Sequence, residues 1–422
     1  MAKPKLALIP SGYSDGKIYS ILPSNGDGDF TTTRASKATR INKDGFIENV
    51  DSGIPRLDYP LIDGVVSGCP SLLLEPQRTN LITQSEAFDN AYWTKSSSSV
   101  TSGFISPTGG LDAFKLVADA NSSAAAHSIY STGVSITNGV SYTGKVYLKY
   151  DNQQYIRVGF GSTGSMGLVL DKRTAVVDLI NGTIITTTTS PATAKITSLS
   201  NGFYEVAVST ISAATGITSL ETSITDSSGS NIISTGAESV YIFGAQLEEG
   251  SYATSYIPTE GTAVTRIADA CSQTPPDGVI GQAEGTLYCE IDFANTSGVA
   301  GAWSISDGSS ANRITINTIG SSSTEFALSI AQNYSSGSTK LASANVTYGD
   351  KHKVAIKYSA TTLKLFIDGQ LVDSVLTDGF GNFTNFYLGG NQNGVGGDAR
   401  KFIQADLYNT ALTDAELITL TS

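Results

Sequence analysis

The chain has 422 residues, 40% of them hydrophobic and only 15% charged, and its net charge at neutral pH is −12. An acidic chain without a Lys/Arg cluster lacks the basic face that nucleic-acid binding requires, and no apolar run is long enough to insert into a membrane. Ser, Thr, Gly and Asn replace the missing charge, and these residues favour turns and pleated surfaces over helices. The composition predicts an all-β protein, and the length predicts about three domains.

Residues 1–80 differ from the rest of the chain in their density of proline and Gly/Asp turns. Proline removes donors from a β-ladder and fixes φ, so a regular sheet throughout this region is excluded. Short strands are expected at Lys17–Leu22, Phe46–Val50 and Ser71–Leu74. We therefore predict an irregular N-terminal region that needs a partner surface to become ordered.

Residues 81–260 show repeated hairpin signals. Asn181-Gly182 and Asn201-Gly202 each separate two β-rich runs, and Asn-Gly suits the positive φ angles of a tight hairpin turn. A third antiparallel pair is expected between Tyr142–Tyr150 and Tyr155–Phe160. Short strands at this spacing predict an antiparallel β-sandwich of the jelly-roll type.

A linker rich in turn-forming residues is predicted over 261–281, and a second antiparallel sandwich over 282–422. Apolar residues alternate with polar ones along the first strand of this sandwich, at Leu287, Cys289, Ile291 and Phe293. Near the end, Thr413 followed three residues later by Glu416 forms a capping-box pattern. This pattern predicts a short C-terminal helix that runs to about Leu420.

Several stretches of sequence carry a family resemblance. They are Arg34–Arg40 (RASKATR), Pro55–Tyr59 (PRLDY), Leu72–Asn80 (LLLEPQRTN) and Gln246–Thr259 (QLEEGSYATSYIPT). Together they resemble a cassette that is common in fibres and other appendages of tailed phages. In those proteins the cassette flanks a jelly roll similar to carbohydrate-binding modules.

A further stretch resembles a different module. Lys353–Ile356, Phe366–Gly369 and Leu407–Glu416 look like the end of a laminin-G-like, concanavalin-A-like sandwich. Such a pattern is specific to a fold but not to a ligand.

The resemblance to phage appendages implies a function. The chain is expected to be a structural virion protein, in a tail or head fibre, spike or decoration, that adheres to glycans on the host surface. It is then made in the host cytoplasm, forms a homo-oligomer, most often a trimer, and attaches to other virion proteins through residues 1–80. Two alternatives stay open: a secreted bacterial glycan-binding protein, for which no signal peptide is evident, and a capsule depolymerase.

The residues do not show a catalytic constellation. His127 and His352 have no nucleophile motif near them, and there is no phosphate-binding loop. Sandwich glycosidases place carboxylates as Glu-x-Asp-x-x-Glu, and Glu290-Ile291-Asp292 begins this pattern, but Asn295 stands where its last acid belongs. We therefore expect no enzymatic activity and no catalytic residue.

No cofactor and no metal site are predicted either. The loop carboxylates Asp307, Asp368 and Asp398 could bind calcium in a laminin-G-like fold, but their spacing is that of ordinary turn residues.

The expected glycan-binding surface lies on the third hairpin of the middle domain. If Val146, Leu148 and their counterparts on the second strand face the core, then Tyr147 and Lys149 on one strand and Tyr155 and Arg157 on the other face outward. Aromatic rings stack on sugar C–H groups, and cationic side chains donate to sugar oxygens. These four residues are our predicted glycan-binding site.

Overall fold

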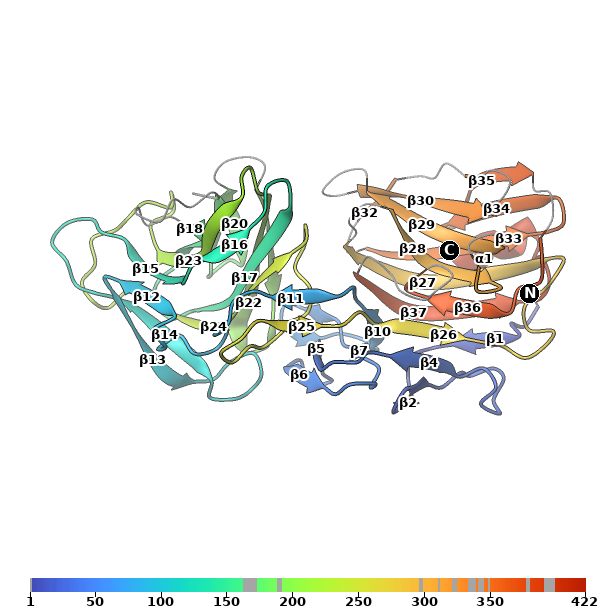
Figure 1. Ribbon diagram of the computed structural model, residues 1–422, viewed down its shortest axis with the longest axis horizontal. Helices are drawn as coiled ribbons and strands as arrows, with labels where there is room; N and C mark the ends of the chain where they lie inside the picture. The colour runs from blue at the N-terminus through green and yellow to red at the C-terminus, as the bar shows by residue number, and fades with distance from the viewer. Residues whose placement is uncertain are drawn as a thin grey trace.

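The computed structural model describes residues 2–161, 173–187, 192–295, 299–309, 312–320, 325–332, 339–340, 345–347, 350–376, 380–390 and 399–422. These residues form two β-sandwiches that lie side by side along the long axis of the molecule (Figure 1). The predicted all-β fold with two antiparallel sandwiches is therefore confirmed. We call them the inserted jelly roll, within residues 81–260, and the body sandwich, which both ends of the chain build together.

Two sheets enclose the core of the inserted jelly roll. The junction sheet, whose outer face looks toward the body sandwich, has the order β13 (Ser98–Phe104), β14 (Ala113–Ala118), β24 (Ser239–Glu249), β17 (Ser141–Tyr150), β22 (Phe203–Ile211), β21 (Thr193–Ser198). The outer sheet has the order β12 (Trp93–Ser96), β15 (His127–Ser131), β23 (Gly216–Ile224), β18 (Tyr155–Gly161), β19 (Arg173–Asp178), β20 (Thr183–Thr187), and β16 (Val134–Ile136) also pairs with β23.

Both Asn-Gly hairpins are confirmed. Asn181-Gly182 connects β19 to β20, and Asn201-Gly202 connects β21 to β22 through the short 3₁₀ turn η1 (Ser200–Gly202). Gly182, Asn201 and Gly202 all have positive φ, as these tight turns require.

The prediction of a third hairpin is wrong. β17 pairs with β22 and β24 in the junction sheet, whereas β18 pairs with β19 and β23 in the outer sheet. Residues 151–154 cross from one sheet to the other. Val146 and Ile156 are both buried in the same core, which they enter from opposite sides. The predicted alternation was correct for each strand, but alternation cannot tell whether two strands share a sheet or face each other across a core.

The body sandwich also has two sheets. The helix sheet has the order β35 (Gln370–Leu376), β34 (Thr362–Ile367), β33 (Lys351–Tyr358), β27 (Gly285–Asn295), β37 (Ala399–Tyr408), β10 (Ser71–Leu74), β7 (Leu57–Asp58), and β1 (Leu6–Leu8) also pairs with β37. The long sheet has the order β2 (Tyr13–Ser14), β3 (Lys17–Ile18), β4 (Phe30–Thr33), β26 (Ala270–Gln273), β36 (Asn385–Leu388), β28 (Val299–Ser306), β29 (Arg313–Gly320), β30 (Glu325–Gln332), β31 (Thr339–Lys340), with β32 (Asn345–Thr347) on β30.

The predicted C-terminal helix is present as α1 (Asp414–Thr421), which packs over β33, β34 and β35. Its capping box is complete: Thr413 Oγ accepts from the Glu416 amide, and the Glu416 carboxylate accepts from the Thr413 amide. The helix buries Leu417 against Phe366 on the outer face of the helix sheet. In the part of the chain that the structure describes, no helix is long and apolar enough to cross a membrane.

The first 80 residues do not form the separate irregular region that we expected. Strand β1 pairs with β37, β10 lies between β37 and β7, and β4 pairs with β26. Leu6, Leu8 and Ile18 are fully buried in one core with Leu287 and Trp303. The partner surface that this segment needs is therefore the C-terminal half of its own chain. Because its apolar residues are already buried there, they do not support the predicted homo-oligomer.

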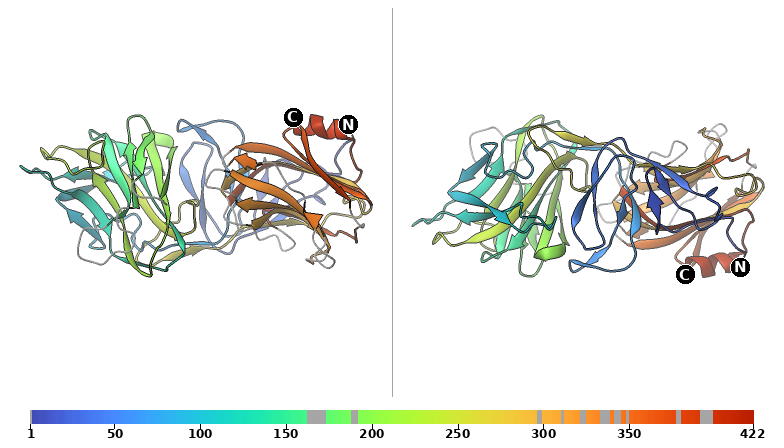
Figure 2. Two further views of the ribbon diagram at one scale, coloured as in Figure 1. Left: turned by 90° about the horizontal axis from the view of Figure 1, so that it is seen from above. Right: turned by 90° about the horizontal axis from the view of Figure 1, so that it is seen from below.

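Three short ribbons complete the N-terminal segment and the connection between the sandwiches. They are β5 (Ala38–Ile41) with β6 (Ile47–Val50), β8 (Leu61–Ile62) with β9 (Val65–Val66), and β11 (Arg78–Asn80) with β25 (Val264–Arg266). The N-terminal segments, drawn in blue, lie at the junction of the two sandwiches and along the body sandwich (Figure 2). The jelly roll is therefore an insertion in the body sandwich, entered through β11 and left through β25.

Candidate functional site

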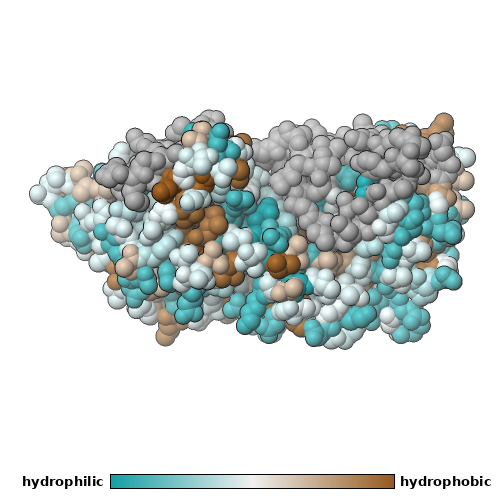
Figure 3. All heavy atoms as spheres, viewed as in Figure 1, coloured by the Kyte–Doolittle hydropathy of each residue, from teal (hydrophilic) through white to brown (hydrophobic). Residues whose placement is uncertain are grey.

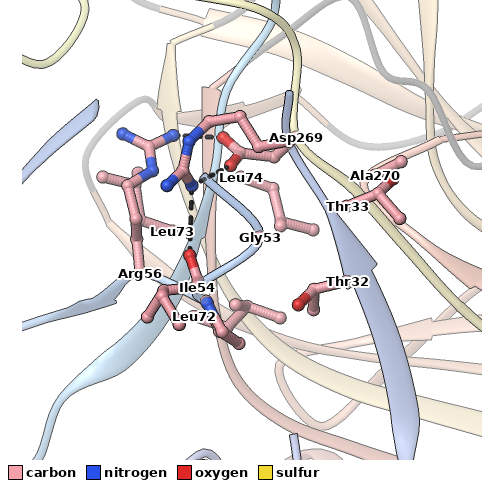
Figure 4. A pocket seen from close by; sticks show the side chains of 12 residues that line it. Thr32, Thr33, Gly53, Ile54, Arg56, Leu72, Leu73, Leu74, Asp269 and Ala270 are labelled. Atoms are coloured by element: carbon pink, nitrogen blue, oxygen red, sulfur yellow. Dashed lines mark hydrogen bonds and ion pairs between the residues drawn. The ribbon is translucent and has the colours of Figure 1, made fainter. Parts of the chain in front are cut away.

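A buried network of charges holds the two ends of the insertion together. Arg56 is fully buried, and its guanidinium donates to Glu75 Oε2 at 2.6 Å and forms an ion pair with Asp269. Figure 4 shows Arg56 and Asp269, from distant parts of the chain, pointing toward one another. Arg34 pairs with the other oxygen of Asp269 at 3.0 Å, and Arg266 pairs with Glu75 at 3.0 Å. We call these five residues the clasp.

The clasp is a structural element. Glu75 follows β10 directly and Asp269 immediately precedes β26, so the network joins the chain where the jelly roll leaves and rejoins the body sandwich. Burial by itself would raise the pKa of Glu75, but the charges of Arg266 and Arg56 hold it below its ordinary value. The cavity beside Arg34 and Arg56 is only about 10 Å³, about the minimum for one water molecule. The clasp therefore positions the sandwiches and leaves no room for a larger ligand.

A larger cleft of about 200 Å³ lies between the two sandwiches. One wall is the outer face of the junction sheet, and the other consists of the helix sheet at β37 and β10 together with β5 and β7. The loop segment 253–256, which follows β24, also lines the cleft. Residues from 39–75, 147, 195–205, 253–256 and 399–401 therefore meet at this site.

Cross-strand neighbours of the junction sheet build the jelly-roll wall. Thr197 on β21 lies opposite Glu205 on β22, and Glu205 lies opposite Tyr147 on β17. The Glu205 carboxylate accepts from Lys145 Nζ at 2.9 Å, and Lys145 is fully buried. Along the edge strand β21, exposed residues alternate with half-buried ones, so Lys195 and Thr197 project together into the cleft.

An ion pair dominates the body wall. Lys401 Nζ on β37 lies 2.9 Å from Asp58 Oδ2, and Asp58 also accepts from the Ile41 amide at 2.7 Å. The charge of Asp58 raises the pKa of Lys401 above its ordinary value. Directly opposite Lys401, on β27, lies Asp292, whose Oδ1 is buried and has no hydrogen-bond partner in the part of the chain that the structure describes. Burial raises the pKa of Asp292, although Lys401 and Lys195 both oppose this effect.

The predicted glycan-binding residues do not form one surface. Tyr147 lies in the junction sheet and borders the cleft, but it is only 2% exposed because its ring packs against Phe243 and Tyr256. Burial raises the pKa of the Tyr147 hydroxyl. Lys149 projects from the same face, half-buried, with Nζ 5.8 Å from the centre of the Phe203 ring.

Tyr155 and Arg157 belong to the outer sheet, on the other side of the jelly-roll core. Tyr155 is half-buried. Arg157 donates to the carbonyl oxygen of Gly229 at 2.8 Å and to Glu221 at 3.2 Å. The platform expected from all four residues is thus not formed, because β17 and β18 do not pair.

Apart from Tyr147, the residues of the cleft were missed in the sequence, although part of the signal was present. Asp58 lies in the PRLDY stretch, and Thr254 and Ser255 lie in the stretch Gln246–Thr259, both of which we related only to a family. Lys195 and Lys401 have no local signal. Their approach depends on how the two sandwiches are packed.

The possible calcium ligands are turn residues where the structure describes them. Asp307 accepts from the Ser309 amide at 2.8 Å, and Asp368 accepts from the Lys353 amide at 2.9 Å. Asp398 lies outside the described residues. Among the residues described, no group of three or more His, Cys, Asp or Glu side chains could hold a metal ion.

No protein-family model matches the sequence, and no curated protein matches it. Solved structures do resemble parts of the chain. The carbohydrate-binding module CBM40 of the Ruminococcus gnavus IT-sialidase, bound to α2,3-sialyllactose, is 19% identical over 34% of this chain and 84% of its own, with a TM-score of 0.29. Domains LG4-5 of the mouse laminin α1 chain are 12% identical over 67% of this chain and 89% of their own, with a TM-score of 0.22.

A third similar structure corrects one of our expectations. Trypanosoma rangeli sialidase, in complex with the inhibitor DANA, is 8% identical over 99% of this chain and 97% of its own, with a TM-score of 0.29. Because a glycoside hydrolase is among the structures that resemble the chain, the expectation that the chain has no enzymatic activity is withdrawn. At this identity the likeness does not assign a reaction to the chain either.

Proposed function

We propose that the protein binds carbohydrate in the cleft between its two sandwiches. The observation that carries the proposal is the cleft itself: about 200 Å³ lined from both sandwiches by hydroxyl, carboxylate and ammonium groups. A sugar ring presents several hydroxyl groups, each of which can donate and accept, so a concave site with mixed polar groups suits it.

The groups on the jelly-roll wall are accessible to such a ligand. Thr197 and Lys195 are exposed, and the Glu205 side chain is 25% exposed beside them. Hydrogen bonds to charged groups are the stronger ones, so Glu205 and Lys195 supply the main acceptor and donor. Buried Lys145 holds Glu205 in place. Figure 3 shows that the coloured surface at the junction of the sandwiches is largely hydrophilic or of intermediate hydropathy.

The biological setting of this activity is the finer part of the proposal. The resemblance to phage appendages supports an adhesive protein of a tailed-phage virion that recognises a glycan on the host surface. On this proposal the protein is made in the host cytoplasm, forms a trimer and contacts other virion proteins through residues 1–80. A map of the virion in which the chain is located, together with light scattering of the purified protein, tests this setting. A monomer that no virion contains would favour a secreted glycan-binding protein.

Two matched variants test the site. Thr197→Trp places a large ring in the cleft from an exposed position on an edge strand, where folding tolerates it. Thr193→Trp makes the same change on the same face of β21, but Thr193 does not line the cleft. We expect glycan-array binding by the wild type and by Thr193→Trp, and a loss of at least about tenfold in affinity for Thr197→Trp. Equal binding by both variants would place the site elsewhere.

A further inference from the structure

We propose that the ligand of the cleft is an acidic glycan, whose carboxylate binds where Lys195 of the jelly roll faces Lys401 of the body sandwich. This inference rests on the proposed function and names its ligand class. It depends on which of the charged groups that line the cleft already have an ion-pair partner.

The carboxylates that line the cleft are already neutralised. Asp58 is paired with Lys401, and Glu205 is paired with Lys145, each at 2.9 Å. Glu75 accepts from two arginines of the clasp. These acids therefore do not offer a free negative charge to a ligand, and they do not repel an anionic one as isolated carboxylates would.

Lys195 differs from the other lining cations. It is exposed on the edge strand β21, it lines the cleft, and no hydrogen bond or ion pair of its ammonium group is present among the described residues. Ala207 lies directly opposite Lys195 on β22, and the next side chain along the same face, Glu205, is paired with Lys145. The ammonium group of Lys195 can therefore donate to a ligand without first losing a protein partner.

Asp292 does not line the cleft itself but lies beside the Lys401 wall. It lies directly opposite Lys401 in the helix sheet, on the face that carries Lys401 toward the cleft, and Lys195 also acts on its charge. Its Oδ1 is buried and has no hydrogen-bond partner among the described residues. Buried polar atoms are nearly always paired, so an atom of this kind next to a cleft indicates a missing ligand or water.

Lys195 and Lys401 thus place ammonium groups on both walls of the cleft, whereas each carboxylate that lines it is paired with a cation. A neutral sugar needs as many acceptors as donors for its hydroxyl groups, but a carboxylate only accepts hydrogen bonds. The arrangement suits a uronic or sialic acid better than a neutral hexose. Losing one charge-assisted hydrogen bond of this kind weakens binding by about tenfold to a hundredfold.

The test uses an array that carries sialylated, uronic-acid-containing and neutral oligosaccharides, followed by calorimetry with the tightest hit and with the methyl ester of its carboxylate. We expect acidic hits, and a loss of about tenfold or more upon esterification. Lys195→Gln should lose the same factor for the acid but not for the ester, and Lys195→Arg should retain most of the affinity. Lys37→Gln, whose side chain is 78% exposed and outside the cleft, is the control for net charge.

The outcomes separate the two proposals. Binding of neutral glycans alone, which Thr197→Trp abolishes, would overturn the acidic ligand and leave the cleft as a glycan site. Acidic hits that Lys195→Gln binds as well as the wild type would also overturn it. Absence of any hit on the array would overturn carbohydrate binding itself. Near-ultraviolet circular dichroism of each variant shows whether a loss of binding reflects a loss of fold.

Discussion

Replacing Glu75 by Gln tests whether the clasp holds the body sandwich together. The Glu75 carboxylate accepts from Arg56 at 2.6 Å and from both the amide and the hydroxyl of Ser255, at 2.8 and 2.6 Å, and it forms an ion pair with Arg266 at 3.0 Å. Glutamine has nearly the same shape but is neutral and keeps only one acceptor oxygen; with that oxygen toward the two arginines, its NH2 group would face the donating backbone N–H of Ser255. Arg266 would then lose its ion pair, and Arg56 would share the carboxylate of Asp269 with Arg34.

The expected loss of stability follows from this arrangement. Removing one partner of a buried ion pair typically costs about 3–5 kcal/mol, because it leaves an uncompensated buried charge. Glu75 has two such partners, so we expect the upper half of that range for unfolding of the body sandwich. Since its folded pKa lies below the ordinary value of 4.5, its contribution is present above that pH and is lost as the pH falls through the folded pKa. The difference from the wild type should therefore persist at pH 7 and shrink only in strong acid.

Urea unfolding followed by tryptophan fluorescence is suited to this measurement, because the two tryptophans lie in different cores. Trp303 belongs to the body sandwich and Trp93 to the jelly roll, so a Trp93→Phe background reports on the body alone. Asp51→Asn, which removes the exposed pair with Lys37 at 3.7 Å, is the matched control and should change little. A loss below about 1 kcal/mol for Glu75→Gln would refute the reasoning.

Three further predictions concern the body sandwich. Burial raises the pKa of Asp406 from 3.8 to about 6, so the ionised carboxylate destabilises the folded state above that pH. Asp406→Asn should therefore stabilise the protein by up to about 3 kcal/mol above pH 6, and this gain should vanish near pH 4. Urea titrations at both pH values will show the difference. Deleting residues 2–80 removes β1, β7 and β10 from the helix sheet. We expect the emission of Trp303 to shift to the red and that of Trp93 to stay unchanged. Native emission from both tryptophans would contradict the core that the two ends of the chain share. Thr413→Ala should cost about 1 kcal/mol through loss of the cap of α1, measured in the same urea assay.

Local patterns in the sequence predicted local structure well. The two Asn-Gly turns, the capping box at Thr413 and the alternation along β27 all depend on residues within a few positions of one another. The same is true of the inward direction of Val146 and Leu148. Such features follow from backbone geometry and side-chain chemistry, which neighbouring residues determine.

The site depended on relations that no local pattern contains. Leu6 pairs with Leu407 because this contact buries apolar residues in the shared core. Asp269 pairs with Arg56 because each buried charge needs a partner of opposite sign. Composition and periodicity therefore determined that the chain is all-β and which side chains of its strands point into a sandwich core, but not that the opposite face of β17 is buried as well. Only the tertiary structure decided that the jelly roll is an insertion and that Lys195 and Lys401 line one cleft from opposite walls. Both features result from packing between distant segments, and such packing leaves no periodic pattern in the sequence.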